Sequence, residues 1–217
     1  MTTVVPGPQS PGWILVVPVK GTPGAKSRLG GDAADRAAIA RAIALDTVAA
    51  VVAADGVVRV IVVTSSDLED EFRALGADVV ADPGGGLAAA IGHGLSVAGT
   101  GSPVAVLLGD LPGLQPSELA DALADAVSRE RAMVPDADGV GTVLVTAGAG
   151  VAHRTAFGGA SRVAHLEAGY AELVVPADSG LRRDVDTREQ LAALGSRIGP
   201  RTAALARTAA LARVVAN

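Results

Sequence analysis

The sequence contains no cysteine, which excludes disulfide bonds, thiolate metal sites and cysteine nucleophiles. Aromatic residues make up only 2% of the chain, so a core has to be built from Val, Leu, Ile and Ala. The longest apolar stretches, such as Trp13–Val19, are too short to span a bilayer. The first twelve residues contain no basic patch followed by an apolar run, which is the pattern of a signal peptide. We therefore expect a soluble, cytoplasmic protein with no membrane partner.

Positive charge is also scarce, because 18 Lys and Arg face 23 Asp and Glu for a net charge of −5. A surface with this balance repels polyanions, so we expect no nucleic-acid partner. Any phosphate binding has to rely on a few placed cations. The oligomeric state stays open, and a homodimer is compatible with the sequence.

Apolar material is plentiful, with 49% of the 217 residues hydrophobic, which suits one domain. Short Val-rich runs alternate with helical patterns, as is typical of strands buried on both faces of a parallel sheet. We predict a disordered leader over 1–12, a single α/β domain over 13–195 with a mostly parallel sheet and helices on both faces, and a C-terminal helix or flexible tail over 196–217. The expected strands are 13–19, 57–64, 77–80, 104–108, 141–146 and 171–175, and the expected helices are 32–54, 66–75, 87–97, 117–131, 161–168 and 187–194.

Ligands of open α/β sheets bind beyond the carboxyl ends of the strands, so the loops after the predicted strands are the candidate sites. The first such loop begins Lys20-Gly21 and also contains Lys26 and Arg28. Its glycines allow close backbone approach to a phosphate, and its three cations could neutralise a triphosphate. It lacks the spacing of a Walker A loop, and a solvated surface loop is the alternative interpretation.

Two carboxylate motifs are candidates for a cation site. Asp110 follows a predicted central strand directly, where a hard cation such as Mg²⁺ could bridge it to phosphates, although a turn aspartate would look the same. Asp186 lies in Asp184-Val185-Asp186-Thr187, where it could be a ligand or the cap of the next helix, since Asp186 and Glu189 have the spacing of a capping box. One or two carboxylates plus substrate phosphates are sufficient for Mg²⁺.

Other motifs keep alternatives open. Gly84–Ala89 matches the Gly-x-Gly-x-x-Ala dinucleotide fingerprint and would favour an NAD(P)-dependent oxidoreductase. Gly158-Gly159-Ala160-Ser161 precedes a helix and could bind an anion, or Ser161 could simply cap that helix. The three histidines, His93, His153 and His165, have no partnered nucleophile, so we expect each of them to be structural or exposed.

In their order along the chain, five motifs resemble the CofC/FbiD guanylyltransferases of deazaflavin coenzyme F(420) biosynthesis. These motifs are Val17-Pro18-Val19-Lys20 with Ala25-Lys26-Ser27-Arg28-Leu29, Leu107-Leu108-Gly109-Asp110-Leu111-Pro112, Gly141-Thr142, Phe157-Gly158-x-x-Ser161-x-x-x-His165, and Asp184-Val185-Asp186-Thr187. The resemblance spans roughly residues 13–194. One departure is Ala88, where relatives often carry an asparagine after Gly-Leu.

The resemblance implies a nucleotide-diphospho-sugar transferase (GT-A-like) nucleotidyltransferase fold and the transfer of GMP from GTP to phosphoenolpyruvate or 2-phospho-L-lactate. Asp110 and Asp186 would hold Mg²⁺, and Lys20, Lys26, Arg28 and Asp110 would be catalytic. Thr142, Gly159 and Ser161 would bind the acceptor. The nucleotide would contact Lys20, Gly21, Lys26, Arg28, Asp82, Gly86 and Asp110. A molybdopterin-type or sugar-phosphate nucleotidyltransferase is the nearest alternative.

Overall fold

The computed structural model describes residues 12–20, 32–65 and 67–215. Residues 1–11 of the predicted leader therefore lie outside the described residues, as do Ser66 and the phosphate-loop residues Gly21, Lys26 and Arg28. The described chain is built around a seven-stranded sheet in the order β3-β2-β1-β4-β6-β5-β7. The strands are β1 (Trp13–Val19), β2 (Val57–Thr64), β3 (Asp78–Ala81), β4 (Val104–Leu107), β5 (Arg131–Pro135), β6 (Thr142–Ala147) and β7 (Ala171–Glu172).

The sheet is mostly parallel, as the sequence predicts. β1 runs parallel to β2 and β4, and β2 runs parallel to β3. β6 is antiparallel to both β4 and β5, while β5 is parallel to β7. Because β6 alone runs the other way, its first residue lies at the edge where the other strands end.

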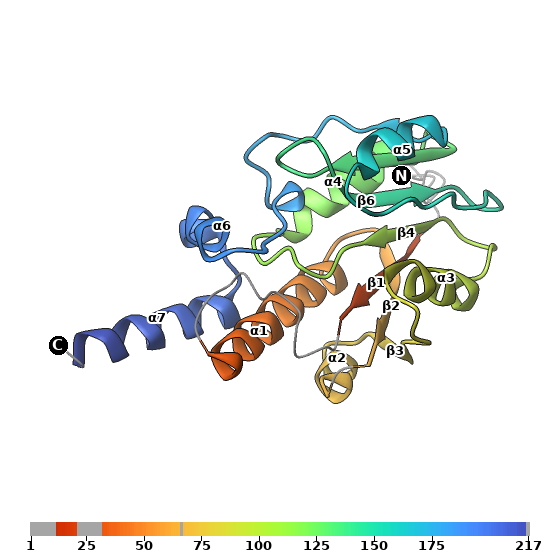
Figure 1. Cartoon of the computed structure of the whole chain (residues 1–217). Coiled ribbons are helices and arrows are strands. Elements are labelled where there is room, and N and C mark those ends of the chain that lie inside the picture. The colour runs from red at the N-terminus through yellow and green to blue at the C-terminus, as the bar shows by residue number, and fades with distance from the viewer. Residues whose placement is uncertain (1–11, 21–31, 66, 216–217) are drawn as a thin grey trace, which may run out of the picture.

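Helices cover both faces of this sheet (Figure 1). The helices are α1 (Ala33–Val52), α2 (Glu69–Ala74), α3 (Leu87–Ala98), α4 (Pro116–Ala126), α5 (Ser161–Glu167), α6 (Arg188–Ala193) and α7 (Pro200–Val215). Buried residues of α1, α2 and α4 share one apolar cluster with one face of the sheet. Buried residues of α3 and partly buried ones beside α5 share a second cluster with the other face. Aliphatic side chains supply nearly all of both clusters, as the composition requires.

Several predicted element boundaries are wrong. The strand expected over 171–175 ends at Glu172, and the helix expected over 66–75 begins at Glu69. The helix expected over 117–131 ends at Ala126, and Arg131 begins strand β5, which the sequence did not predict. The sequence prediction ended the helix at Arg131 and assigned residues 132–135 to no element, since Ala132 and Met133 are good helix formers with no strand signal of their own. Both are fully buried between β6 and β7, and this strand pairing overrides local propensity.

The helix starts are predicted with mixed success. The sequence predicts Asp32 as the cap of one helix and Ser66 or Asp67 as the cap of the next. Asp32 does cap α1, since its Oδ1 accepts the amide of Asp35 at 2.8 Å. Asp67 does not cap α2, whose N-cap is Leu68 with no side-chain hydrogen bond.

The C-terminal segment is anchored on α1. The buried carboxylate of Asp46 accepts the amides of Arg201 at 3.2 Å and Thr202 at 2.8 Å, and Arg201 Nη1 at 3.3 Å. Gly199 lies so close to Asp46 that an added Cβ would meet its carboxylate at 2.4 Å. α7 therefore starts against the middle of α1 and then extends away from the sheet (Figure 1). Across the described residues, no helix combines the length and the apolarity that crossing a membrane demands.

Candidate active site

The candidate residues meet at the carboxyl edge of the sheet. Lys20 follows β1 and is exposed, Asp82 follows β3, and Asp110 comes shortly after β4. Thr142 opens β6 at the same edge, because β6 is antiparallel to β4 and the amide of Leu108 donates to Val143 O at 3.0 Å. Parallel strands thus bring together residues that are far apart in the sequence.

Gly109 is required for this convergence. An added Cβ there would meet Val19 Cγ2 at 2.9 Å and Pro18 O at 3.0 Å. Such a contact is tighter than real Cβ atoms show, so only glycine lets the chain after β4 run so close to the end of β1. Asp110 is consequently held beside the strand that leads into Lys20.

The backbone at Asp110 is held from two sides. Its carbonyl accepts the amide of Val185 at 3.0 Å. The next amide, that of Leu111, donates to the buried hydroxyl of Thr47 on α1 at 3.0 Å. Thr47 in turn donates to Ile43 O at 2.8 Å. The hydrogen bond to Val185 joins the Asp110 loop to the Asp-Val-Asp motif.

Several carboxylates crowd this junction. The pKa of Asp184 is raised to about 6, mainly by burial and to a smaller extent by the neighbouring charges of Asp110, Asp136 and Asp186, in that order. Oδ1 of Asp110 is buried as well. This excess of negative charge suits a divalent cation, which would lower the repulsion. Across the residues that the structure describes, no group of three or more acidic or histidine side chains is arranged as a complete metal site. If two carboxylates bind the cation, substrate oxygens would have to supply its remaining ligands.

The capping interpretation of Asp186 is wrong. The N-cap of α6 is Thr187, whose Oγ1 accepts the amide of Gln190 at 3.2 Å. Gln190 Oε1 accepts the amides of Asp186 and Thr187 at 2.8 and 3.0 Å. The cap therefore uses the backbone amide of Asp186 and the side chain of Thr187, and Asp186 itself is exposed. Its predicted metal role stays a prediction.

The predicted acceptor residues border one another. Thr142 is buried and its Oγ1 lies 3.0 Å from Nδ1 of His165. Ser161 and His165 are both buried, and their four-residue spacing on α5 puts them on the same face of that helix. Gly159, two residues before α5, is exposed. The structure thus brings Thr142 and Ser161 to one side of α5.

The predicted nucleotide contacts Asp82 and Gly86 lie in the connection between β3 and α3. Asp82 Oδ1 accepts the amide of Gly84 at 2.9 Å, which is a local turn bond. Gly84, Gly85 and Gly86 all have positive φ, of 80°, 85° and 89°, a backbone that other residues rarely adopt. The role of Asp82 and Gly86 in nucleotide binding stays a prediction.

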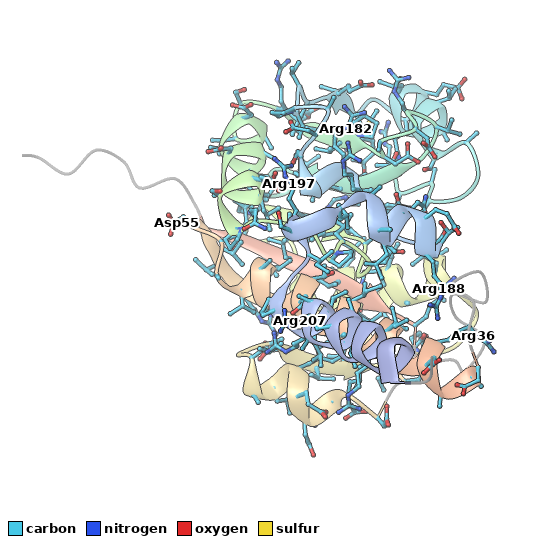
Figure 2. The ribbon with its side chains drawn as sticks, turned by 90° about the vertical axis from the view of Figure 1, so that its left-hand side faces the viewer. Arg36, Asp55, Arg182, Arg188, Arg197 and Arg207 are labelled. Atoms are coloured by element: carbon cyan, nitrogen blue, oxygen red, sulfur yellow. The ribbon has the colours of Figure 1, made fainter. Side chains whose placement is uncertain are left out.

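Sequence reasoning missed several residues of this region. Thr47 and Asp184 were not singled out, because a threonine inside a helix and the first of two aspartates carry no distinctive pattern. Asp136, which follows β5, was missed with that strand; its carboxylate accepts the amides of Val140 and Gly141 at 3.0 and 2.7 Å. Figure 2 shows Arg36 of α1 and Arg188 of α6 on one side of the molecule.

Comparison with known proteins defines the family. Residues 24–216 match the MobA-like NTP transferase domain. The chain is 50% identical to phosphoenolpyruvate guanylyltransferase of Streptomyces coelicolor, covering 89% of this chain and 95% of the relative, and 48% identical to that of Streptomyces scabiei over the same shares. A nucleotidyl transferase from Methanothermobacter shares the fold with a TM-score of 0.62 at 21% identity, covering 90% of this chain and 98% of that one. A Desulfovibrio desulfuricans G20 protein assigned as a nucleotide-diphospho-sugar transferase does so with a TM-score of 0.68 at 20% identity, covering 93% and 96%.

These matches decide between the alternatives that the sequence left open. The fingerprint-like Gly84–Ala89 segment belongs to a nucleotidyltransferase, and the oxidoreductase interpretation is set aside. The chain belongs to the MobA-like NTP transferases and, within them, to the family of enzymes named phosphoenolpyruvate guanylyltransferase.

Proposed function

We propose that this protein transfers GMP from GTP to phosphoenolpyruvate and releases pyrophosphate, giving enolpyruvyl-diphospho-5'-guanosine for deazaflavin coenzyme biosynthesis. The observation that carries the proposal is the carboxylate cluster around Asp110 and Asp184 at the carboxyl edge of the sheet, in a chain half identical to relatives with that name. Phosphoenolpyruvate is preferred to 2-phospho-L-lactate because the relatives' names specify it.

In the proposed reaction a phosphate oxygen of phosphoenolpyruvate attacks the α-phosphorus of GTP. The new P–O bond forms as the bond from the α-phosphorus to the leaving pyrophosphate breaks. The attacking oxygen is already anionic, so no protein base is needed. This agrees with His165, which is buried and whose Nε2 is occupied by the amide of Ala156 at 2.8 Å. Rate acceleration then rests on positioning and on charge neutralisation.

The chain's own residues divide this work. Lys20 lies at the end of β1, and we infer that it neutralises the triphosphate together with Lys26 and Arg28 of the same loop. Asp110 with Asp186 would hold Mg²⁺, and Asp184 is a third carboxylate near enough to take part. When bound there, Mg²⁺ would neutralise charge on the reacting phosphates. We assign the acceptor's anionic end to Thr142, Ser161 and Gly159.

The test is pyrophosphate release by the full chain with Mg²⁺, GTP and phosphoenolpyruvate. CTP and ATP replace GTP as controls, and 2-phospho-L-lactate replaces the acceptor. Asp110→Asn should nearly abolish release without unfolding the protein, because it removes a charge and keeps the shape. The matched control is Asp125→Asn, which changes an exposed aspartate on α4. Release that is indifferent to the nucleotide, or normal in the Asp110 variant, contradicts the proposal.

A further inference from the structure

His165 stands out among the buried polar side chains because both of its ring nitrogens have partners. Its side chain is fully buried at the end of α5 nearest the sheet's second apolar cluster. Nε2 receives the backbone amide of Ala156 at 2.8 Å. Nδ1 lies 3.0 Å from Oγ1 of Thr142. The ring thus connects the segment before α5 to the first residue of β6.

These two contacts determine where the ring proton lies. A backbone N–H can only donate, so Nε2 has to be the unprotonated nitrogen that accepts it. Burial lowers the pKa of His165, and a hydrogen bond to the Ser161 backbone opposes this to a smaller extent, so the ring is neutral with a single proton. That proton is therefore on Nδ1, where Oγ1 of Thr142 accepts it at 3.0 Å beside the Ser161 backbone.

The tautomer has a consequence for Thr142. Its hydroxyl oxygen is already an acceptor, so the hydroxyl proton has to find an acceptor elsewhere. Within residues 12–20, 32–65 and 67–215, His165 is the one hydrogen-bond partner of this side chain. Thr142 is only 3% exposed, and a buried donor without an acceptor costs about 1–3 kcal/mol. A ligand that brings an anionic oxygen to Oγ1 would satisfy it.

We propose that His165 is a positioning residue, which fixes the Thr142 hydroxyl as a hydrogen-bond donor aimed at the anionic group of the acceptor substrate. The inference rests on the proposed function, which places Thr142 in the acceptor site. His165 itself touches no reacting atom. Its effect is to decide the direction of one hydroxyl bond, and so it acts on acceptor binding and not on the nucleotide.

The surroundings hold the ring in this orientation. Phe157 and Tyr170 stand edge-on to it, with ring centroids 5.1 and 5.2 Å away and interplanar angles of 75° and 71°. Tyr170 Oη in turn accepts the amide of Arg154 at 2.9 Å and lies 3.1 Å from His153 Nδ1. A flip of the His165 ring would give up both of its hydrogen bonds within this packed cluster.

Two conservative variants separate the role in positioning from the role in packing. Asparagine can place an amide donor near the site of Nδ1, so His165→Asn keeps the bond to Thr142 and loses the acceptor for Ala156. Glutamine can reach the site of Nε2, so His165→Gln keeps the acceptor for Ala156 and loses the bond to Thr142. Both variants remove the ring, so a loss that comes only from packing affects them alike.

The experiment measures KM for phosphoenolpyruvate, KM for GTP, kcat and Tm for the wild type, both His165 variants, Thr142→Val and the pair Thr142→Val/His165→Gln. We expect His165→Gln to raise KM for phosphoenolpyruvate about 10-fold, the value of one hydrogen bond to a charged group, with KM for GTP unchanged. His165→Asn should raise it far less. In the Thr142→Val background the His165→Gln change should add little, because the hydroxyl it orients is gone.

Equal losses in the two His165 variants, equal effects on both substrates, or full additivity with Thr142→Val would overturn the proposal. His153→Gln is the matched control, since it disturbs the same cluster without touching Thr142. The ring tautomer is also read without any turnover, from long-range ¹H–¹⁵N spectra of the labelled imidazoles. A proton on Nε2 of His165 overturns the proposal directly. A proton on Nδ1 in a wild type that releases no pyrophosphate shows that the proposed function has failed while the assigned tautomer stands.

Discussion

Removing the Thr47 hydroxyl tests how the Asp110 loop is held. Thr47→Val keeps the shape of the side chain but leaves the amide of Leu111 without its acceptor at 3.0 Å. Thr47 and Leu111 are both fully buried, so water cannot replace the bond, and we expect a loss of about 1–3 kcal/mol in the free energy of unfolding. Asp110 immediately precedes Leu111 in the chain, and a displacement of about 1 Å at a catalytic group can cost on the order of 100-fold in rate. Pyrophosphate release should therefore fall about 10- to 100-fold.

Thr47→Ser is the matched control, because it keeps the hydroxyl and removes only a methyl group, at about 1 kcal/mol. Valine, serine and threonine have similar helix propensities, so α1 itself is little affected. Denaturant unfolding followed by circular dichroism gives the stability, and the release assay gives the rate. If Thr47→Val releases pyrophosphate at the wild-type rate, or if Thr47→Ser is slowed as much, the hydroxyl does not position Asp110.

Three further predictions concern buried charge. Asp46→Ala removes the acceptor of three hydrogen bonds to Arg201 and Thr202 and should cost about 1–3 kcal/mol, seen as lower stability and faster proteolysis within α7; unchanged proteolysis would contradict the anchoring role. Burial lowers the pKa of His153 to about 4, below its unfolded value of about 6.5. As the pH falls, the unfolded chain therefore binds a proton before the folded protein does, and the protein should lose about 3 kcal/mol of stability between pH 6.5 and pH 4. His153→Gln should reduce this loss. Asp184→Asn removes a carboxylate whose folded pKa, about 6, is raised above its ordinary value, a shift that lowers the stability of the wild type as the pH rises from 4 to 6. At pH 8 the free energy of unfolding of the variant should therefore be about 2 kcal/mol higher, after allowance for solvent screening, while its pyrophosphate release falls. A variant less stable than the wild type would refute the crowding of carboxylates.

The sequence predicted the sheet edge and its main residues for a physical reason. Short runs of β-branched residues without polar alternation favour strands buried on both faces of a parallel sheet, and a ligand site lies where such strands end. Lys20 after β1 and Asp110 after β4 follow from these two rules alone. The same reasoning failed at β5, because Ala132 and Met133 suit a helix equally well until β6 and β7 pair with them.

Polar groups inside helices were out of reach for sequence reasoning. Thr47 and Asp46 are adjacent residues in the apolar middle of α1, and their partners lie 64 and 155 residues away. Nothing local distinguishes them from polar residues on an exposed helix face. Their burial becomes predictable only when α1 is known to be covered on two sides, by the sheet on one and by the segment that starts α7 on the other.

Four aromatic and histidine side chains gather in and beside a segment that has no helix or strand to stabilise its backbone, namely His153, Phe157, His165 and Tyr170. Residues 148–160, between β6 and α5, contain no helix or strand, so their amides need acceptors from elsewhere. The amides of Arg154 and Ala156 find them in Tyr170 Oη and His165 Nε2, and His153 Nε2 reaches the carbonyl of Val104 at 3.0 Å. An aliphatic core could fill the same volume but could not accept these bonds. His165, which is buried, and His153, which is partly buried, therefore both hold this segment in place. The segment leads into Gly159 and Ser161. The His165 ring then both holds the segment and orients the Thr142 hydroxyl. Because Nε2 accepts the amide of Ala156, Nδ1 carries the ring proton and faces Thr142.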